Sequence, residues 1–120
     1  MGYTLIVDDS ATERSIITNY LQEVGLNVSV ALSGEEALIK IEQNFPDLIV
    51  LDIVLPGRSG FEICRELKGS DNTNKIPIIL CSTKGTDMDK FWGMKQGADA
   101  YISKPVDREE LVGKVKELIA

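Results

Sequence analysis

The feature of the sequence that most constrains its fold is a regular alternation between two hydrophobic patterns. Short apolar runs, the pattern of buried strands, are separated by segments in which apolar residues recur at helical spacing. The first, third and fourth runs are nearly continuous and rich in β-branched residues, which is typical of strands that a parallel sheet buries on both faces. The predicted strands are 3–7, 26–32, 47–51, 77–81 and 99–103.

Each predicted helix begins with a capping sequence, in which an oxygen acceptor precedes an acidic residue by three positions. The acceptor can bind a free N–H of the first turn, and the acidic side chain favours the positive end of the helix. One such match is weak evidence, but a match after every predicted strand and turn is strong evidence. The pairs are Ser10 and Glu13, Ser33 and Glu36, Ser59 and Glu62, Thr86 and Asp89, and Asp107 and Glu110.

The alternation predicts an α/β fold, because right-handed crossovers place helices on both faces of a parallel sheet. We expect a flavodoxin-like, doubly wound (βα)5 sandwich with a five-stranded parallel sheet of order 2-1-3-4-5. A chain of 120 residues, 43% of them hydrophobic, is long enough to bury one core. The sequence therefore predicts a single domain over residues 1–120.

Polar side chains occur where four of the five predicted strands end. In a sheet of this order the ligand crevice lies beyond the carboxyl ends of the strands. Each residue alone has a plain structural explanation, as a turn, a strand end or a lysine that reaches solvent. Their coincidence at one edge of the sheet favours a shared site. The residues are Asp8 and Asp9, Asp52, Ser82 and Thr83, and Lys104.

This set of side chains predicts a chemistry. Three nearby carboxylates repel one another unless a cation lies between them, and a few oxygen ligands with retained water favour Mg²⁺. Asp52, alone on its strand, is the candidate nucleophile, since aspartyl phosphates are known covalent species. Mg²⁺ and Lys104 would neutralise charge on a transferring phosphoryl group.

Composition excludes several functions. The absence of histidine excludes an internal histidine base, a Ser-His triad and a histidine metal site. The net charge of −6 argues against nucleic acid as a partner. Without a bilayer-spanning apolar stretch or a signal-peptide pattern, we expect no membrane partner and a cytoplasmic location. Cys64 and Cys81 are expected to be buried, reduced thiols rather than a disulfide.

The residues of this predicted site resemble those of response-regulator receiver domains, the phospho-acceptor halves of bacterial two-component systems. The resemblance extends over the whole chain, in the segments "LIVDDS", "LIVLDIVLPGRSGFE", "IPIILCST" and "GADAYISKP". More narrowly, "DKFWG" and "KPVD" are similar to the stand-alone regulators of type IV pilus (twitching) motility, the PilH-like group. Single-domain regulators of chemotaxis or phototaxis share much of this pattern.

The resemblance implies a separate role for each acidic residue. Asp52 would be the phosphorylated residue. Asp9 and Asp52 would ligate Mg²⁺ directly, Asp8 would act largely through water, and the Val54 carbonyl would supply a further ligand. The protein would not be an enzyme beyond its own phosphoryl transfer and slow autodephosphorylation.

The resemblance also implies a switch. Lys104, with a cis bond to Pro105, would contact the phosphoryl group. Ser82 would move toward that group, and Tyr101 would turn into the space left. The surface of helix 4, strand 5 and helix 5, roughly residues 86–119, would then bind a downstream protein target. A histidine kinase would supply the phosphate from a phosphohistidine, and the receiver domain would act as a monomer without an output domain, or as a phosphate sink.

Three alternatives remain at this point. A haloacid-dehalogenase-like phosphatase also uses an Asp nucleophile, but it needs a second Asp at the position of Val54. A flavodoxin-type FMN carrier is a second alternative, but the acidic segment "DDSATE" would repel the phosphate of FMN. A third is an adaptor that has the receiver fold but is not controlled by phosphorylation.

Among the other residues, Phe91 is expected in the core, and Trp92 fits either core packing or a partner contact. Gly57 and Gly60 are expected to relieve backbone strain after Asp52.

Overall fold

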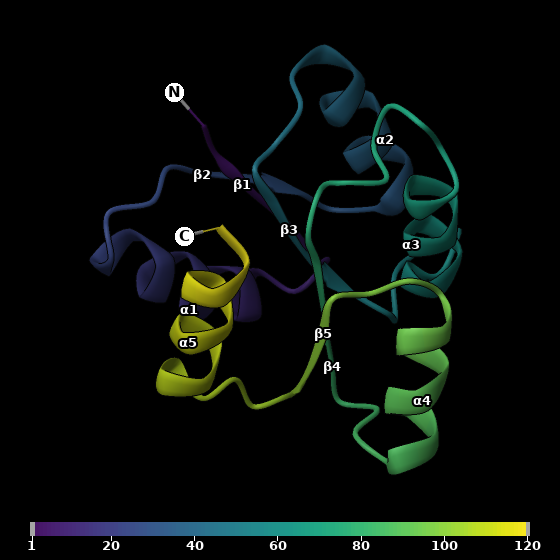
Figure 1. The fold of residues 1–120 in the computed structure, drawn as a ribbon. Coiled ribbons are helices and arrows are strands. Elements are labelled where there is room, and N and C mark those ends of the chain that lie inside the picture. Colours follow the sequence, from purple (N-terminus) through teal and green to yellow (C-terminus); the bar gives the residue numbers. More distant parts are fainter. Residues whose placement is uncertain (1, 120) are drawn as a thin grey trace.

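A computed structural model of the protein describes residues 2–119 and contains the predicted alternation of strands and helices (Figure 1). The strands are β1 (Thr4–Val7), β2 (Val28–Ala31), β3 (Leu48–Asp52), β4 (Ile78–Ser82) and β5 (Ala100–Ser103). The helices are α1 (Ala11–Glu23), α2 (Gly34–Gln43), α3 (Gly60–Lys68), α4 (Asp87–Lys95) and α5 (Arg108–Ile119).

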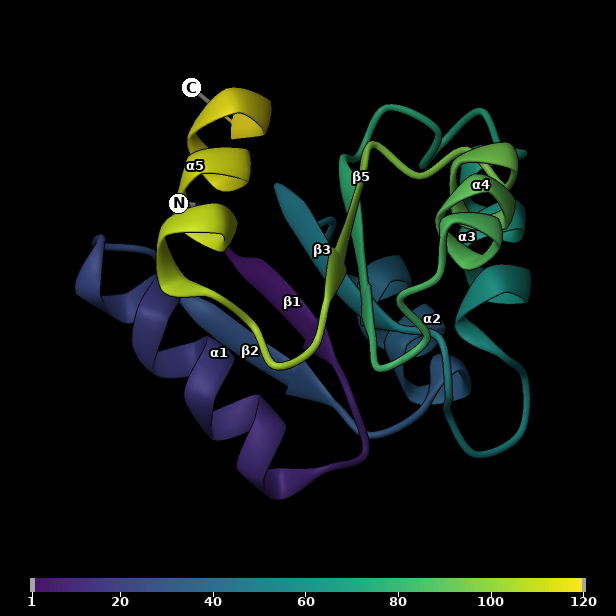
Figure 2. The same ribbon diagram turned by 90° about the horizontal axis from the view of Figure 1, so that it is seen from below.

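The five strands form one parallel sheet in the order β2-β1-β3-β4-β5, which confirms the predicted flavodoxin-like topology. Helices α1 and α5 cover one face of the sheet, and α2, α3 and α4 cover the other (Figures 1 and 2). Each face carries its own apolar core. Ile17 and Leu111 belong to the first core, and Ile41 and Ile63 belong to the second.

Strand β3 lies at the centre of the sheet, and all five of its residues are buried, including the terminal Asp52. Strand β1 pairs with β3 from Thr4 to Val7, and β4 pairs with it up to Asp52 opposite Cys81. Because these strands are parallel, the residues at their carboxyl ends share one edge of the sheet. This edge carries the polar residues that the sequence singles out.

All five predicted caps are present. In every helix the cap oxygen accepts a hydrogen bond from the backbone N–H three residues later, at 2.9–3.3 Å. In α3 and α4 the acidic side chain also accepts from the cap N–H, so the capping box is reciprocal. The caps fix where each helix begins, and therefore the length of each loop at the carboxyl edge of the sheet. The cap residues are Ser10, Ser33, Ser59, Thr86 and Asp107.

Helix α4 contradicts one prediction, because Phe91 lies outside the core with 55% of its surface exposed. The only buried residue of α4 is Gly93, where an added β-carbon would lie 2.8 Å from the Tyr101 ring. This close approach places the residues opposite Gly93 in solvent, and Trp92 is 54% exposed. The large exposed apolar residues of α4 are Met88, Phe91, Trp92 and Met94.

The two cysteines agree with the sequence prediction. Cys64 and Cys81 are buried and unpaired, and burial raises the pKa of their thiols to about 11 and about 12. They therefore pack as small apolar groups. Within residues 2–119, no helix has the length and apolar character that a membrane crossing requires.

Candidate functional site

Three carboxylates meet at the carboxyl edge of the sheet. Asp8 and Asp9 follow β1, Asp52 ends β3, and one carboxylate oxygen from each lies within 4.8 Å of the others. Asp8 and Asp52 are buried, with 1% and 7% of their surfaces exposed, whereas Asp9 is exposed. They line a cavity of about 530 Å³. The chain thus assembles a compact acidic site from segments more than 40 residues apart.

Lys104 lies between two of these carboxylates. Its Nζ donates to Asp8 Oδ2 at 2.6 Å and to Asp52 Oδ2 at 3.3 Å, and only 8% of its side chain is exposed. The backbone N–H of Lys104 donates to the Ser82 carbonyl at 2.9 Å, which extends the β4–β5 pairing, and the bond to Pro105 is cis. Lys104 is therefore directed into the acidic site.

Among the three carboxylates of the site, Asp8 accepts the shortest hydrogen bonds. Its Oδ1 accepts the Ser10 N–H at 2.9 Å, and its Oδ2 accepts Lys104. Asp52 is bound more loosely, because Val54 N–H and Lys104 both donate to it at 3.3 Å. The oxygens of Asp52 are therefore freer than those of Asp8 to bind a new group. Asp52 ends the buried strand β3.

The pKa of Asp52 is raised above its ordinary value of 3.8. Burial is the largest cause, and the charge of Asp8 adds to it, whereas Lys104 and the Val54 N–H act in the opposite direction. Burial alone would lower the pKa of Lys104, but its hydrogen bond to Asp8 and the charges of Asp52 and Asp8 outweigh burial and raise it. The lysine therefore stays protonated beside a carboxylate whose ionisation is costly.

We expect Asp52→Asn to be more stable than the wild type in Mg²⁺-free buffer near neutral pH. Because the folded pKa of Asp52 exceeds the unfolded value, its ionisation costs folding free energy as the pH rises through the folded pKa. Below the unfolded pKa both states are protonated and this cost is absent. Urea unfolding from about pH 3 to about pH 7 measures it, and the advantage of the variant should grow with pH. A difference that is constant with pH would contradict the prediction.

Lys104→Gln should destabilise the Mg²⁺-free protein by about 3 kcal/mol, because it leaves two buried carboxylates without a cation. The same variant should bind Mg²⁺ more tightly, since the ammonium no longer neutralises Asp8 or competes for Asp52. Urea unfolding with and without MgCl₂ measures both effects. Lys114→Gln, which removes an exposed ion pair, serves as the control. Equal stability of the two variants would contradict the prediction.

The remaining predicted residues lie around this site in different ways. Ser82 is fully buried, and its Oγ accepts the Lys84 N–H at 3.3 Å. The Tyr101 hydroxyl donates to the Lys84 carbonyl, so Ser82 and Tyr101 are joined through one backbone residue. Val54 lines the cavity, and 53% of it is exposed.

Sequence reasoning missed one contributor to the site and gave the wrong reason for another. Glu13 lines the cavity, although the sequence indicates it only as the acidic partner of a helix cap. Gly60 begins α3 directly over the end of β3, where an added β-carbon would lie 2.0 Å from the Asp52 carbonyl oxygen. Its φ angle is not positive, so close approach, and not the expected backbone strain, requires glycine here. Gly57 does have a positive φ of 73°.

The donor set fits a hard divalent cation. Three carboxylates that can direct oxygens to one point, with Asp9 open to solvent, provide the ligands that Mg²⁺ prefers while leaving room for water. Receiver domains typically bind Mg²⁺ at an acidic cluster of this kind.

The fold and this acidic edge agree with sequence comparison. A profile of the response regulator receiver domain family matches residues 4–116. The chain belongs to this family, so it is a signalling domain of a two-component system rather than a catalytic one. Membership in the family implies a histidine kinase and a downstream target as partners.

Individual relatives place the chain within the family. It is 40% identical to Protein PilH of Pseudomonas aeruginosa over 120 residues, which are 100% of this chain and 99% of PilH. It is 35% identical to the phosphate regulon transcriptional regulatory protein PhoB of Rhizobium meliloti over 114 residues, which are 95% of this chain but 50% of PhoB. The predicted resemblance to receiver domains, including the PilH-like group, is confirmed.

Solved structures give the same result. The receiver domain of the Francisella response regulator 1452 matches with a TM-score of 0.91 and 32% identity, covering 99% of this chain and 97% of that one. The chemotaxis response regulator CheY4 of Vibrio cholerae matches with a TM-score of 0.89 and 30% identity, covering 98% of each chain.

Proposed function

We propose that the protein is a stand-alone response regulator of the cytoplasm that accepts a phosphoryl group on Asp52. The observation that carries the proposal is a buried carboxylate held loosely at the end of β3, beside a buried ammonium and two further carboxylates. A Val at position 54, where a phosphatase of the haloacid-dehalogenase kind needs a second Asp, argues against repeated turnover. The match to PilH, which covers 99% of that protein, supports a PilH-like role.

The chemistry proceeds at one oxygen of Asp52. This oxygen forms a bond to the phosphorus of a phosphohistidine on the kinase, while the P–N bond breaks and its electron pair stays on the imidazole. Lys104 then leaves Asp8 and Asp52 and contacts the phosphoryl oxygens. It does so because the phosphoryl group on Asp52 carries more negative charge than the free carboxylate did.

Asp9 and Asp52 would hold Mg²⁺ directly, with the Val54 carbonyl as a further ligand. Asp8 already accepts hydrogen bonds on both oxygens, which favours a contact through water. Bound Mg²⁺ supplies positive charge that screens the carboxylates from the incoming phosphoryl group.

In this proposal the backbone of Lys84 links the movements of Ser82 and Tyr101. When Ser82 turns toward the phosphoryl group, its bond to the Lys84 N–H breaks, and the loop before α4 is free to move. Tyr101, which holds the carbonyl of the same residue, then has a new position available. Phosphorylation thereby shifts the population of the α4–β5–α5 surface.

The exposed side chains of α4 suit this surface to protein binding. The Phe91 and Trp92 rings lie 6.4 Å apart, and Lys95 Nζ lies 5.4 Å from the Phe91 ring centre. Trp is one of the residue types that are enriched at binding hot spots. The likeness to PilH and the segments "DKFWG" and "KPVD" support a role in type IV pilus motility, with a chemotaxis-like pathway as the alternative.

The proposal is tested by incubating the protein with acetyl phosphate, with MgCl₂ or with EDTA, and measuring intact mass. A phosphoryl adduct should form only with Mg²⁺, and peptide mapping should place it on Asp52. An adduct of equal yield in EDTA, or one on another residue, would contradict the proposal. Sustained hydrolysis of p-nitrophenyl phosphate over many turnovers would favour the phosphatase instead.

A further inference from the structure

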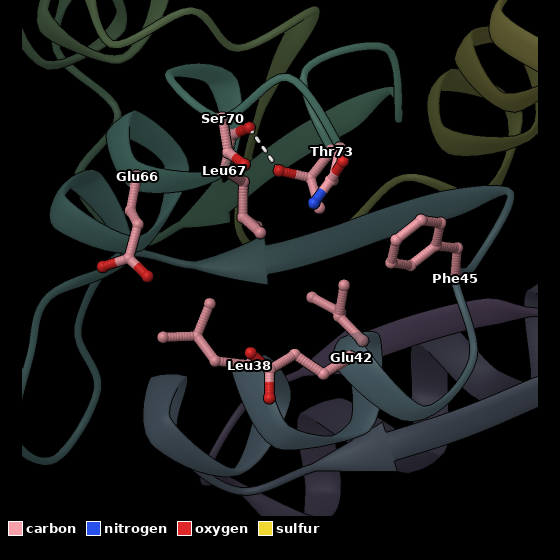
Figure 3. Close-up of a pocket in the computed structure, with 9 residues that line it drawn as sticks. Leu38, Glu42, Phe45, Glu66, Leu67, Ser70 and Thr73 are labelled. Carbon is pink, nitrogen blue, oxygen red and sulfur yellow. Dashed lines mark hydrogen bonds between the residues drawn. The ribbon is translucent and has the colours of Figure 1, made fainter.

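A second cavity of about 500 Å³ lies between α2 and the C-terminal half of α3 (Figure 3). Leu38 and Leu67 line it from the two helices, and Phe45 lines it from the loop after α2. The Thr73 hydroxyl donates to the Leu67 carbonyl at 2.6 Å and fixes the turn that closes one side. This groove shares no lining residue with the acidic site, so the proposed phosphorylation chemistry does not account for it.

Two large apolar side chains at or beside the groove are exposed. Phe45 is 50% exposed at the edge of the groove. Ile39, adjacent to Leu38 on α2, does not line the cavity, but it is 59% exposed on the outside of the same helix. Glu42 follows Ile39 by three positions and therefore lies beside it on the same helix face. A surface that continues beyond the cavity suits a protein segment better than a small molecule.

The charged side chains that line the groove are both acidic. Glu42 lines it from α2 and Glu66 from α3. Arg58 pairs with Glu66 at 2.6 Å and holds it at the edge, whereas no basic side chain within residues 2–119 forms an ion pair with Glu42. An occupant with a positive charge next to an apolar group would complement this lining.

We propose that the α2–α3 groove is a docking site for a partner protein segment that presents an apolar side chain flanked by lysine or arginine. The apolar side chain enters between Leu38 and Leu67 and covers Phe45, and the basic residue pairs with Glu42. A second copy of the chain is a poorer occupant, because each copy carries a net charge of −6. This surface lies on α2 and α3, apart from the α4–β5–α5 surface.

The probe is a fluorescein-labelled leucine–lysine peptide that forms an amphipathic helix, compared with the leucine–glutamate peptide of the same pattern. Binding to unphosphorylated protein in Mg²⁺-free buffer is measured by anisotropy, and the site is mapped by amide NMR shifts. We expect shifts in α2 and α3 with the lysine peptide and none with the glutamate peptide. Because neither phosphate nor Mg²⁺ is present, failure here leaves the proposal for Asp52 intact.

Three variants locate the contact. Glu42→Lys should raise Kd by about tenfold, which corresponds to about 1.4 kcal/mol. Asn72→Trp should block the groove by volume, since Asn72 is an exposed lining residue. Glu23→Lys, which makes the same charge change at the exposed end of α1, should alter Kd by less than about twofold.

Several outcomes would overturn the proposal. These are an equal loss of binding in Glu42→Lys and Glu23→Lys, amide shifts that centre on α4, or no binding of the lysine peptide. Self-association that Glu42→Lys abolishes would identify a second copy as the occupant and would also reject the basic partner. Circular dichroism checks the fold of each variant. If Asn72→Trp does not fold, Glu42→Lys alone tests whether the peptide binds in the groove.

Discussion

Asp52→Asn should form no phosphoryl adduct with acetyl phosphate and Mg²⁺. The amide cannot supply the anionic oxygen that would attack phosphorus, and it also removes one of three converging carboxylates. Asp8 and Asp9 should not take over, because Asp8 is engaged by Ser10 and Lys104, and Asp9 is on the exposed side. Intact mass after incubation measures the loss.

The matched control is Asp47→Asn. Asp47 is an exposed acid immediately before β3, at the opposite end of the strand that carries Asp52. Its variant has the same change in charge and should form the adduct in wild-type yield. An adduct in Asp52→Asn equal to that of the control would place the nucleophile elsewhere.

Gly60→Ala should lower the free energy of unfolding by about 3 kcal/mol. The new methyl group would lie 2.0 Å from the Asp52 carbonyl oxygen and 2.8 Å from the Ile53 Cα, both backbone atoms that cannot turn away. The Gly60 N–H also donates to the Ile53 carbonyl at 2.8 Å, so relief of the clash would break this contact. Urea unfolding followed by circular dichroism measures the effect.

The comparison is with Gly113→Ala in α5. A β-carbon at Gly113 would meet no atom within 4 Å, so alanine should stabilise the helix by roughly 0.5–1 kcal/mol. The same substitution should therefore have opposite signs at the two positions. If Gly60→Ala were as stable as the wild type, the start of α3 could not lie as close to the end of β3 as the structure places it.

The helices and strands were predictable because the forces that select them act locally. Apolar runs and helical spacing indicate which segments are buried, and a cap needs only residues three positions apart. The convergence of Asp8, Asp52 and Lys104 could be predicted because parallel strands bring their carboxyl ends to one edge. The preference of Lys104 for Asp8 could not, since it depends on distances between side chains from β1, β3 and β5.

Helix α4 shows why pattern alone misplaced a residue. Phe91 is a large apolar residue, and apolar side chains in helices usually face the core. The core instead receives Gly93, because Tyr101 and Leu80 already fill the space beneath it, each within 3 Å of where a β-carbon would be. Only the packed sheet contains that information.

Short-range spacing and parallel strand pairing are sufficient to predict the order of elements, the helix starts and the edge at which the polar residues gather. Three features follow only from the packed fold: which carboxylate holds the lysine, which glycine a close contact requires and which apolar residues remain in solvent. These features depend on how side chains from distant segments of the chain pack together, and a local sequence pattern carries no information about that packing.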